Sequence, residues 1–444
     1  MLSRAVSLLV LLATSCTMLA ISCASEDGKP LRIVLVTLDT LRSDTLFGSD
    51  TRPSAMPETH ALTRRGLVFE SFYAAMPTTL PSHASMLTGL QPWEHGLTRN
   101  GLVLSPMHET VAEILRQAGF RTAAVVASAP LHSRFGLSKG FETYVDDFDL
   151  NPEKKDSVGG ADLPEEKFYS LADTVTRRAR RVLSELEGEC QLVWIHYFDP
   201  HDPYGDTRGS DLRTRGQILA LGAVESNRTG HATATVRLVR DLYDADAAFL
   251  DARLAPLLRD ILEDESFLTH VIIAADHGES LGEDGILGHG MHVRQEQLRV
   301  PLIVFSPRLG PGTRTDPVGS IDVAATLLDL AGVEARVAGR SLLQPSLPDH
   351  GVFGMRRTYD QPVEDVRIDG SHHSIPERVY FALHGGVLVT GNPDEVTSGS
   401  DNPALGIKLR GLFAAFQERL SRTGAGELVD ENMQKALEAL GYVK

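Results

Sequence analysis

The chain has 444 residues, 42% of them hydrophobic, and a formal net charge of −16 at pH 7. This balance excludes a disordered chain and a basic nucleic-acid-binding arm, and the presence of only three cysteines excludes a disulfide framework. Because the length exceeds the roughly 250–300 residues at which one core stops growing, we expect a large domain with a smaller one appended.

The N-terminal segment resembles a secretory signal. Arg4 precedes an apolar run over residues 5–21, which is too short and too interrupted by polar residues for a membrane-spanning helix of roughly 20 apolar residues. The run closes on residues 19–23 (LAISC), which resemble a bacterial lipoprotein cleavage site with Cys23 as the lipid-attachment residue; cleavage and release is the alternative. We predict a signal peptide over residues 1–23 and an exported protein, either periplasmic or anchored to the envelope through this end alone.

Beyond Pro30, short β-branched runs alternate with longer amphipathic stretches. The runs of strand length are residues 32–38, 122–127, 192–198, 270–275 and 302–305. The helical stretches are residues 110–118, 165–187 and 236–262. This order predicts an α/β fold with a mostly parallel central sheet flanked by helices on both faces. Ligands of such sheets bind at the carboxyl ends of the strands.

The rest of the chain is less regular. Surface loops are expected at residues 151–162 and 205–230, and glycine and proline become denser around residues 310–350. A strand pair at residues 379–383 and 387–390 and two helices at residues 403–420 and 432–440 follow. We therefore predict a large α/β domain over residues 31–345 and a smaller C-terminal α+β unit over residues 346–444.

Two predicted strands end in residues suited to metal binding. Asp39 follows the first strand, and Asp276 and His277 follow the strand at residues 270–275. A carboxylate oxygen beside an imidazole nitrogen suits a divalent cation. An aspartate after a strand can also serve only as a helix cap.

Thr79 stands at a predicted turn into a helix, with Pro81 expected at the first helical position. Its hydroxyl would face the free N–H groups of the helix end, which favour anions; the alternative is a cap without chemistry. A further cluster, residues 194–204 (WIHYFDPHDPY) with residues 288–292 (GHGMH), is dense in histidine and aspartate directly after a strand.

Taken together, these stretches resemble the sulfatase family of the alkaline phosphatase superfamily. The matching segments are residues 36–42, 79–96, 199–204, 276–283 and 437–443. The resemblance covers residues 31–345 closely and the remainder loosely. It implies one divalent metal ion (Ca, Mn or Zn) held by Asp39, Asp276 and His277, with Thr79 as nucleophile and further ligand.

The resemblance also implies roles around the substrate. Asn100 matches an asparagine that donates to a non-bridging oxygen, His201 matches a histidine near the leaving group, and His289 stands where many relatives carry a lysine for the same task. An alternative is a second metal site formed by Asp199, His201 and His289.

The segment that carries the nucleophile departs from the family pattern. Sulfate ester hydrolases carry Cys or Ser followed by x-Pro-x-Arg and convert the first residue to formylglycine. This chain has Thr79 there, and oxidation of threonine would give a ketone instead of the required aldehyde. His83 replaces the arginine and is a further catalytic candidate. Threonine nucleophiles occur in nucleotide phosphodiesterases and phosphoethanolamine transferases of the superfamily, so the resemblance favours phosphoester or phosphonoester cleavage over desulfation.

The acidic charge disfavours polyanionic partners, so we expect a small anionic ester and no nucleic acid. Two alternatives stay open. One is a transferase that passes the group from Thr79 to an acceptor in the cell envelope. The other is a catalytically inactive binding protein on the same frame, because the family's cysteine and arginine are missing.

Overall fold

The computed structural model describes residues 28–147, 168–205, 212–347, 351–359, 363–375, 379–384, 387–391 and 396–397. Its centre is an eight-stranded sheet in the order β11-β2-β10-β7-β1-β6-β4-β5. These strands are β1 (Leu31–Leu38), β2 (Leu67–Phe69), β4 (Arg121–Val125), β5 (Thr143–Val145), β6 (Cys190–Tyr197), β7 (Leu268–Ala275), β10 (Leu302–Phe305) and β11 (Gly312–Arg314). Only β10 runs against its neighbours, β7 and β2, so this sheet is mostly parallel, as predicted.

The three central strands end in register. Leu38, the last residue of β1, pairs with Tyr197 of β6 on one side and with Ala275 of β7 on the other. Every residue of β1 and β6 is buried, as expected for parallel strands covered on both faces. The residues that follow these strands therefore meet at one edge of the sheet.

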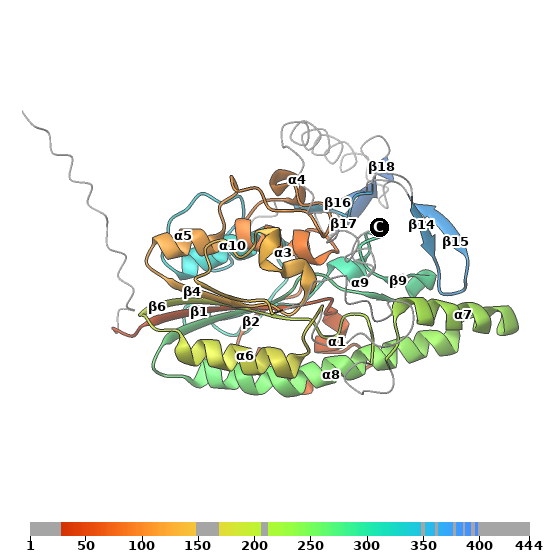
Figure 1. Cartoon of the computed structure of the whole chain (residues 1–444), viewed down its shortest axis with the longest axis horizontal. Coiled ribbons are helices and arrows are strands. Elements are labelled where there is room, and N and C mark those ends of the chain that lie inside the picture. The colour runs from red at the N-terminus through yellow and green to blue at the C-terminus, as the bar shows by residue number, and fades with distance from the viewer. Residues whose placement is uncertain are drawn as a thin grey trace, which may run out of the picture.

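Helices cover both faces of the sheet, which confirms the predicted fold class (Figure 1). One face carries α6 (Ala172–Glu185) and α8 (Thr233–Glu263), and the other carries α3 (Thr79–Thr88), α5 (Val111–Gln117) and α10 (Ser320–Leu330). The shorter helices are α1 (Ser43–Phe47), α2 (Pro57–Thr63), α4 (Pro92–His95), α9 (Gln295–Leu298), η1 (Ala129–Leu131), η2 (Ser133–Phe135) and η4 (Glu283–Gly285). The short strands β3 (Phe72–Tyr73) and β12 (Val318–Gly319) pair with each other, as do β8 (Ser280–Leu281) and β9 (Leu287–Gly288).

The segment after residue 350 packs on the large domain. Its sheet comprises β13 (Val352–Met355), β16 (Tyr380–His384), β17 (Val387–Gly391) and β18 (Val396–Thr397), and β14 (Val363–Val366) pairs with β15 (His372–Ile375). The predicted strand pair is confirmed as β16 and β17. Val352 and Phe381 share a buried apolar cluster with Tyr73 and Leu298, so this unit is fixed against the large domain.

Two predicted elements were wrong. Residues 205–230 are not all loop, because α7 (Arg215–Thr229) begins after a Thr214 cap and ends at Gly230. Only Ile218 and Gly222 of α7 are buried, so the sequence carries little apolar periodicity. The helix predicted over residues 165–187 begins only at Ala172, because the backbone before it pairs with residues 127–129.

Several predictions lie outside the described residues. These are the signal peptide over residues 1–23 with Cys23, the loop at residues 151–162, the helices at residues 403–420 and 432–440, and the tail at residues 437–443. Along the part of the chain that is described, no helix combines the length and apolar character needed to cross a lipid bilayer.

Candidate active site

The metal ligands predicted from sequence come together at the edge where β1 and β7 end. Asp39, Asp276 and His277 each offer a ligand atom, and these atoms all lie within 4.8 Å of one another. The Nε2 atom of His277 is 3.6 Å from Asp39 Oδ1 and 3.5 Å from Asp276 Oδ2. All three residues are completely buried.

A strained turn after β1 aims Asp39 at this edge. Thr40 has φ of 55°, an uncommon value for a β-branched residue. Its N–H donates to Asp276 Oδ1 at 3.2 Å, and its carbonyl accepts from the Tyr243 hydroxyl of α8 at 2.7 Å. Tyr243 also accepts from the Arg42 N–H at 3.1 Å. Such strain costs about 1–3 kcal/mol and typically persists at functional sites.

The donor atoms of this cluster fit a divalent cation. Both carboxylate oxygens of Asp39, Oδ2 of Asp276, Nε2 of His277 and Oγ1 of Thr79 are buried and, among the described residues, have no hydrogen-bond partner. Burial raises the pKa of both Asp39 and Asp276 well above the usual range. The negative charge of Glu279 raises the pKa of Asp39 further, and the negative charge of Asp39 raises that of Asp276. Two such carboxylates need a nearby positive charge to stay ionised.

His277 has the tautomer that metal binding requires. Its Nδ1 donates to the Gly278 carbonyl at 3.1 Å, which leaves the Nε2 lone pair facing the two aspartates. Burial lowers the pKa of His277 well below its usual value, with the positive form of His289 adding to the effect, so the ring is neutral.

The first turn of α3 is held against the same edge. Ser82 donates its hydroxyl to the Asp276 carbonyl at 2.6 Å, and His83 Nδ1 lies 3.5 Å from Asp276 Oδ2. Thr79 is the first residue of this helix. We predicted Pro81 at the first helical position, and this was wrong, because Pro81 is the third residue. The buried Thr79 therefore stands at the start of a helix whose first turn contacts Asp276.

His83 supports this helix instead of facing a substrate. Its Nδ1 donates to the Thr79 carbonyl at 2.8 Å, and its Nε2 accepts from the Thr37 hydroxyl at 3.0 Å. Thr37 in turn accepts from the Trp194 indole at 2.9 Å. Both ring nitrogens of His83 are therefore engaged with protein groups, and a catalytic role for His83 stays a prediction.

Asn100 fixes the start of the same helix. Its Oδ1 accepts from the Leu80 N–H at 2.9 Å, which satisfies one of the orphan donors of the first turn. The side-chain amino group is then the donor that remains for a ligand oxygen. A contact of this amino group with a substrate oxygen stays a prediction.

The predicted leaving-group histidines form a second cluster beside the first. The ring of His289 lies 4.4 Å from that of His277 and 5.0 Å from that of His201, measured between centroids. His289 Nδ1 donates to Oε1 of the buried Glu279 at 3.0 Å. Burial lowers the pKa of His289 to about 3, and the positive charges of Arg357 and Arg215 contribute.

The alternative with two metal ions is not supported. Asp199 is buried after β6, but in the described part of the chain the only group of three converging His, Cys, Asp or Glu ligands is Asp39, Asp276 and His277. Asp199, His201 and His289 do not converge as a second set.

Four residues around the site were missed. His196 of β6 accepts from the Ala127 N–H at 3.1 Å, so its Nε2–H points to Asp39 Oδ2 at 3.5 Å. His196 lies within the motif at residues 194–204, and Glu279 lies within the motif at residues 276–283. Their position inside these motifs was the sequence signal that could have identified them. Arg215 and Arg357 lie in distant segments, so no local pattern could have found them.

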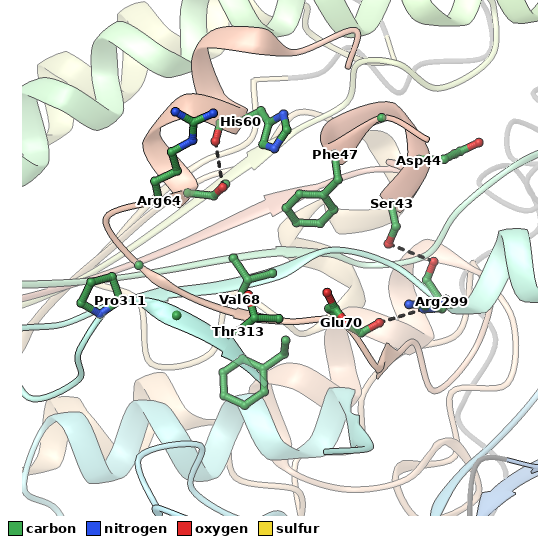
Figure 2. A pocket seen from close by; sticks show the side chains of 15 residues that line it. Ser43, Asp44, Phe47, His60, Arg64, Val68, Glu70, Arg299, Pro311 and Thr313 are labelled. Carbon is green, nitrogen blue, oxygen red and sulfur yellow. Dashed lines mark hydrogen bonds between the residues drawn. The ribbon is translucent and has the colours of Figure 1, made fainter. Parts of the chain in front are cut away.

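A pocket on the described surface lies away from these residues. A pocket of about 740 Å³ lies between α1, α2 and the edge strands β2 and β11, lined by Phe47, His60, Arg64 and Arg299 among others (Figure 2). None of the predicted site residues lines it. The candidate active site is therefore recognised by its buried polar atoms without hydrogen-bond partners among the described residues, and not by the volume of a pocket.

The fold and the cluster at the strand ends define an alkaline phosphatase-like α/β protein. Residues 32–333 match the sulfatase family, so the chain belongs to that family and is a hydrolase of the sulfatase class. Enzymes of this family bind a divalent metal, and the Asp39 cluster offers a site for it.

Known proteins similar to this chain include sulfate and phosphonate ester hydrolases. The choline-sulfatase of Rhizobium meliloti is 27% identical over 353 residues, which cover 69% of this chain and 68% of that protein. The multifunctional alkaline phosphatase superfamily protein PehA of Trinickia caryophylli is 24% identical over 85% of this chain and 93% of its own length. The structure of a phosphonate monoester hydrolase from Silicibacter pomeroyi superposes with a TM-score of 0.63 at 20% identity, covering 89% of this chain and 96% of that one.

Proposed function

We propose that this protein is a metal-dependent hydrolase that cleaves small phosphoesters or phosphonoesters through a covalent intermediate on Thr79, in preference to sulfate esters. The observation that carries the proposal is the buried Thr79 hydroxyl, which has no hydrogen-bond partner among the described residues and stands at the start of α3, the helix whose first turn contacts Asp276 of the cluster. A secondary alcohol at this position cannot become formylglycine, but it can attack phosphorus directly.

The cluster would hold the cation through Asp39, Asp276 and His277, with Thr79 as a further ligand. When bound, a divalent cation lowers the pKa of an adjacent hydroxyl and offsets charge on the oxygens of a tetrahedral anion. Ca, Mn and Zn all suit mixed carboxylate and imidazole ligands.

The protein groups then divide the reaction between them. Thr79 loses its hydroxyl proton to solvent, and its Oγ1 attacks phosphorus while the bond to the leaving oxygen breaks and the Asn100 amino group donates to a non-bridging oxygen. His289 donates from Nδ1 to Glu279, so it needs a second proton, on Nε2, to serve the leaving oxygen. The negative charge of the bound ester favours this doubly protonated form, which transfers the Nε2 proton to the leaving oxygen; His201 is the alternative donor. Water then attacks phosphorus, gives a proton back to the histidine and releases Thr79.

The location and substrate size follow from the sequence. The net charge of −16 disfavours extended polyanions, so the substrate is a small anionic ester. We also propose that residues 1–23 act as an export signal, after which the enzyme is either periplasmic or held on the bacterial envelope through a lipid on Cys23.

A substitution at Thr79 tests the proposal. Thr79→Ala should lower kcat on aryl phosphonate and phosphodiester substrates by at least about 10³-fold, while elemental analysis finds unchanged metal content. Thr79→Ser, which keeps a hydroxyl, should retain measurable turnover. Acid quenching of the wild-type reaction should leave a phosphoryl-type group on the peptide that contains Thr79.

Assays on matched aryl phosphate, phosphodiester, phosphonate and sulfate esters with Mn, Zn or Ca decide the preference. Faster turnover of sulfate esters would contradict the phosphorus preference, and full activity of Thr79→Ala would remove Thr79 from the mechanism.

A further inference from the structure

Two arginines bracket the histidine proposed to serve the leaving group. His289 lies between Gly288 and Gly290, which both have positive φ. A Cβ atom at Gly288 would lie 2.9 Å from Nε of Arg215, and one at Gly290 would lie 3.2 Å from Cδ of Arg357. The two glycines thus let a guanidinium side chain pack on each side of His289.

The two arginines differ in how their charge is balanced. Arg215 donates from Nε to the Leu287 carbonyl at 2.8 Å and lies 3.7 Å from the buried Asp365. Arg357 is only 8% exposed and donates from Nε to the Tyr359 hydroxyl. Within the described residues, no acidic side chain forms an ion pair with Arg357. Glu279, the acid nearest to His289, is engaged with the His289 ring.

A second unpaired arginine stands directly behind Arg357. Arg356 is 1% exposed, and its Nη1 donates to the Arg357 carbonyl at 3.0 Å. Its Nε and Nη2 atoms have no hydrogen-bond partner in the described part of the structure. Burial lowers the pKa of Arg356 to about 10, and the charge of Arg357 contributes, so the Arg356 side chain remains charged at neutral pH. The centroid of the Tyr359 ring lies within 5.1 Å of the guanidinium carbons of Arg356 and Arg357.

The position of Arg357 relates it to the reaction centre. The same Cβ built at Gly290 would lie 3.4 Å from the carbonyl oxygen of Pro77, two residues before Thr79. In addition, Thr358 donates its N–H to the Thr98 carbonyl at 3.0 Å, two residues before Asn100. Arg357 therefore lies between the segment that carries the nucleophile and the loop that carries His289.

Buried cations without acidic partners are costly unless an anion compensates them. In a protein with 59 acidic and 43 basic residues, two adjacent buried arginines without an acid are an unusual arrangement. We infer that Arg357, backed by Arg356, forms a subsite for an anionic group, such as a carboxylate or phosphate, carried on the leaving-group part of the substrate. This inference rests on the proposed function, because it takes His289 as the mark of the leaving-group side.

The test compares two esters that differ only in that charge. The substrates are 4-carboxyphenyl methylphosphonate and its neutral analogue 4-carbamoylphenyl methylphosphonate, with the full-length enzyme loaded with Mn. For the wild type we expect KM to be about 10- to 100-fold lower for the carboxylated ester, the range of a charge-assisted hydrogen bond. Arg357→Gln should remove this preference and change KM for the carbamoyl ester less than about threefold.

Two further variants control for charge and folding. Arg308→Gln removes an exposed arginine that pairs with Asp329, and it should keep the full preference. Arg357→Lys retains a positive charge and should keep part of the preference for the carboxylated ester. A folding defect of Arg357→Gln would therefore not hide the result. Equal KM values for the two esters in the wild type, or an equal loss for both in Arg357→Gln, would overturn the inference.

A binding measurement separates this inference from the proposed function. Calorimetry of the two esters with Thr79→Ala should show the same preference without turnover, and the double variant with Arg357→Gln should lack it. If the wild type turned over neither ester, the proposed phosphonoester cleavage would fail, yet a retained binding preference would still support the subsite. Failure of Thr79→Ala to distinguish the two esters would overturn it.

Discussion

At the level of single residues, Thr79 is the side chain on which the proposed chemistry depends. The resemblance seen in the sequence puts it where sulfate ester hydrolases of the family carry a residue that can be oxidised to an aldehyde. Its hydroxyl is buried at the start of α3 and has no hydrogen-bond partner among the described residues. Around it, His277, His289 and His83 each have one ring nitrogen bound to a protein group, so their tautomers are fixed. Hydrogen bonds within the protein thus orient these histidine rings before any ligand binds.

Glu279 should act through His289. Glu279→Ala removes the acceptor that orients Nδ1 of His289 at 3.0 Å. We expect kcat for alkyl phosphonates, whose leaving groups need protonation, to fall by about 10²-fold, and kcat for 4-nitrophenyl esters to change little. Steady-state kinetics over a leaving-group series measures this difference.

The matched control is Glu279→Gln, which keeps a carbonyl oxygen as acceptor and should restore most of the lost rate. An equal loss of rate for good and poor leaving groups would show that Glu279 has no part in proton transfer.

At the scale of elements, backbone contacts hold the ligand-bearing turns. The N–H of Gly278, next to His277, donates to the Gln297 carbonyl of α9 at 2.8 Å. The hydroxyl of Tyr243 in α8 holds the turn after β1 in the same way. Two helices distant in sequence therefore define where Asp39 and His277 can point.

Gly278→Ala tests the contact with α9. A Cβ atom there would lie 2.1 Å from the Glu296 carbonyl oxygen, so the turn must shift. We expect a loss of about 1–3 kcal/mol in the free energy of unfolding and about a tenfold weaker affinity for Mn. Denaturant unfolding and metal titration measure the two effects.

Gly310→Ala is the control, since a Cβ atom at Gly310 meets nothing within 4 Å. If Gly278→Ala bound Mn like the wild type, the turn would not depend on this close approach.

The strand β7 also carries an acid-sensitive residue away from the site. Burial lowers the pKa of His270 to about 4, with Arg308 contributing. The unfolded chain therefore takes up a proton near pH 6.5 that the folded chain takes up only near pH 4, so the folded state loses stability as the pH falls between these values. At pH 5, this one group should cost about 2 kcal/mol relative to pH 7.5.

The variant His270→Leu should remove that part of the pH dependence, as measured by urea unfolding at pH 7.5 and pH 5. Both ring nitrogens of His270 lack hydrogen-bond partners among the described residues, so leucine leaves no group unpaired. His231→Leu, at an exposed histidine, should behave like the wild type. An unchanged slope for His270→Leu would contradict this assignment.

At the scale of the whole molecule, the site joins segments from the entire described chain. β1 supplies Asp39, β7 leads to Asp276, α3 begins with Thr79, and the segment after β13 adds Arg357. The segment after residue 350 therefore packs against the loops that carry the candidate site residues. A bound cation would tie β1 to β7, so its binding should be coupled to global stability.

Removal of the metal tests this coupling. Dialysis against EDTA should lower Tm, and free Ca, Mn or Zn at about 100 times its Kd should restore about 2.7 kcal/mol. The response should persist in Thr79→Ala and be lost in Asp276→Ala. Elemental analysis should find one equivalent per chain; two equivalents would contradict the single site.

From the sequence alone we could predict five of the eight strands of the sheet, the edge at which they end and a candidate set of metal ligands. Buried parallel strands have a distinctive β-branched composition, and Asp39, Asp276 and His277 follow such strands directly. The hydrogen bonds of His83, the helix α7 and the place of Arg357 beside His289 became visible only in the folded structure. These features depend on packing between segments far apart in the chain, and neither periodicity nor local motifs record such contacts.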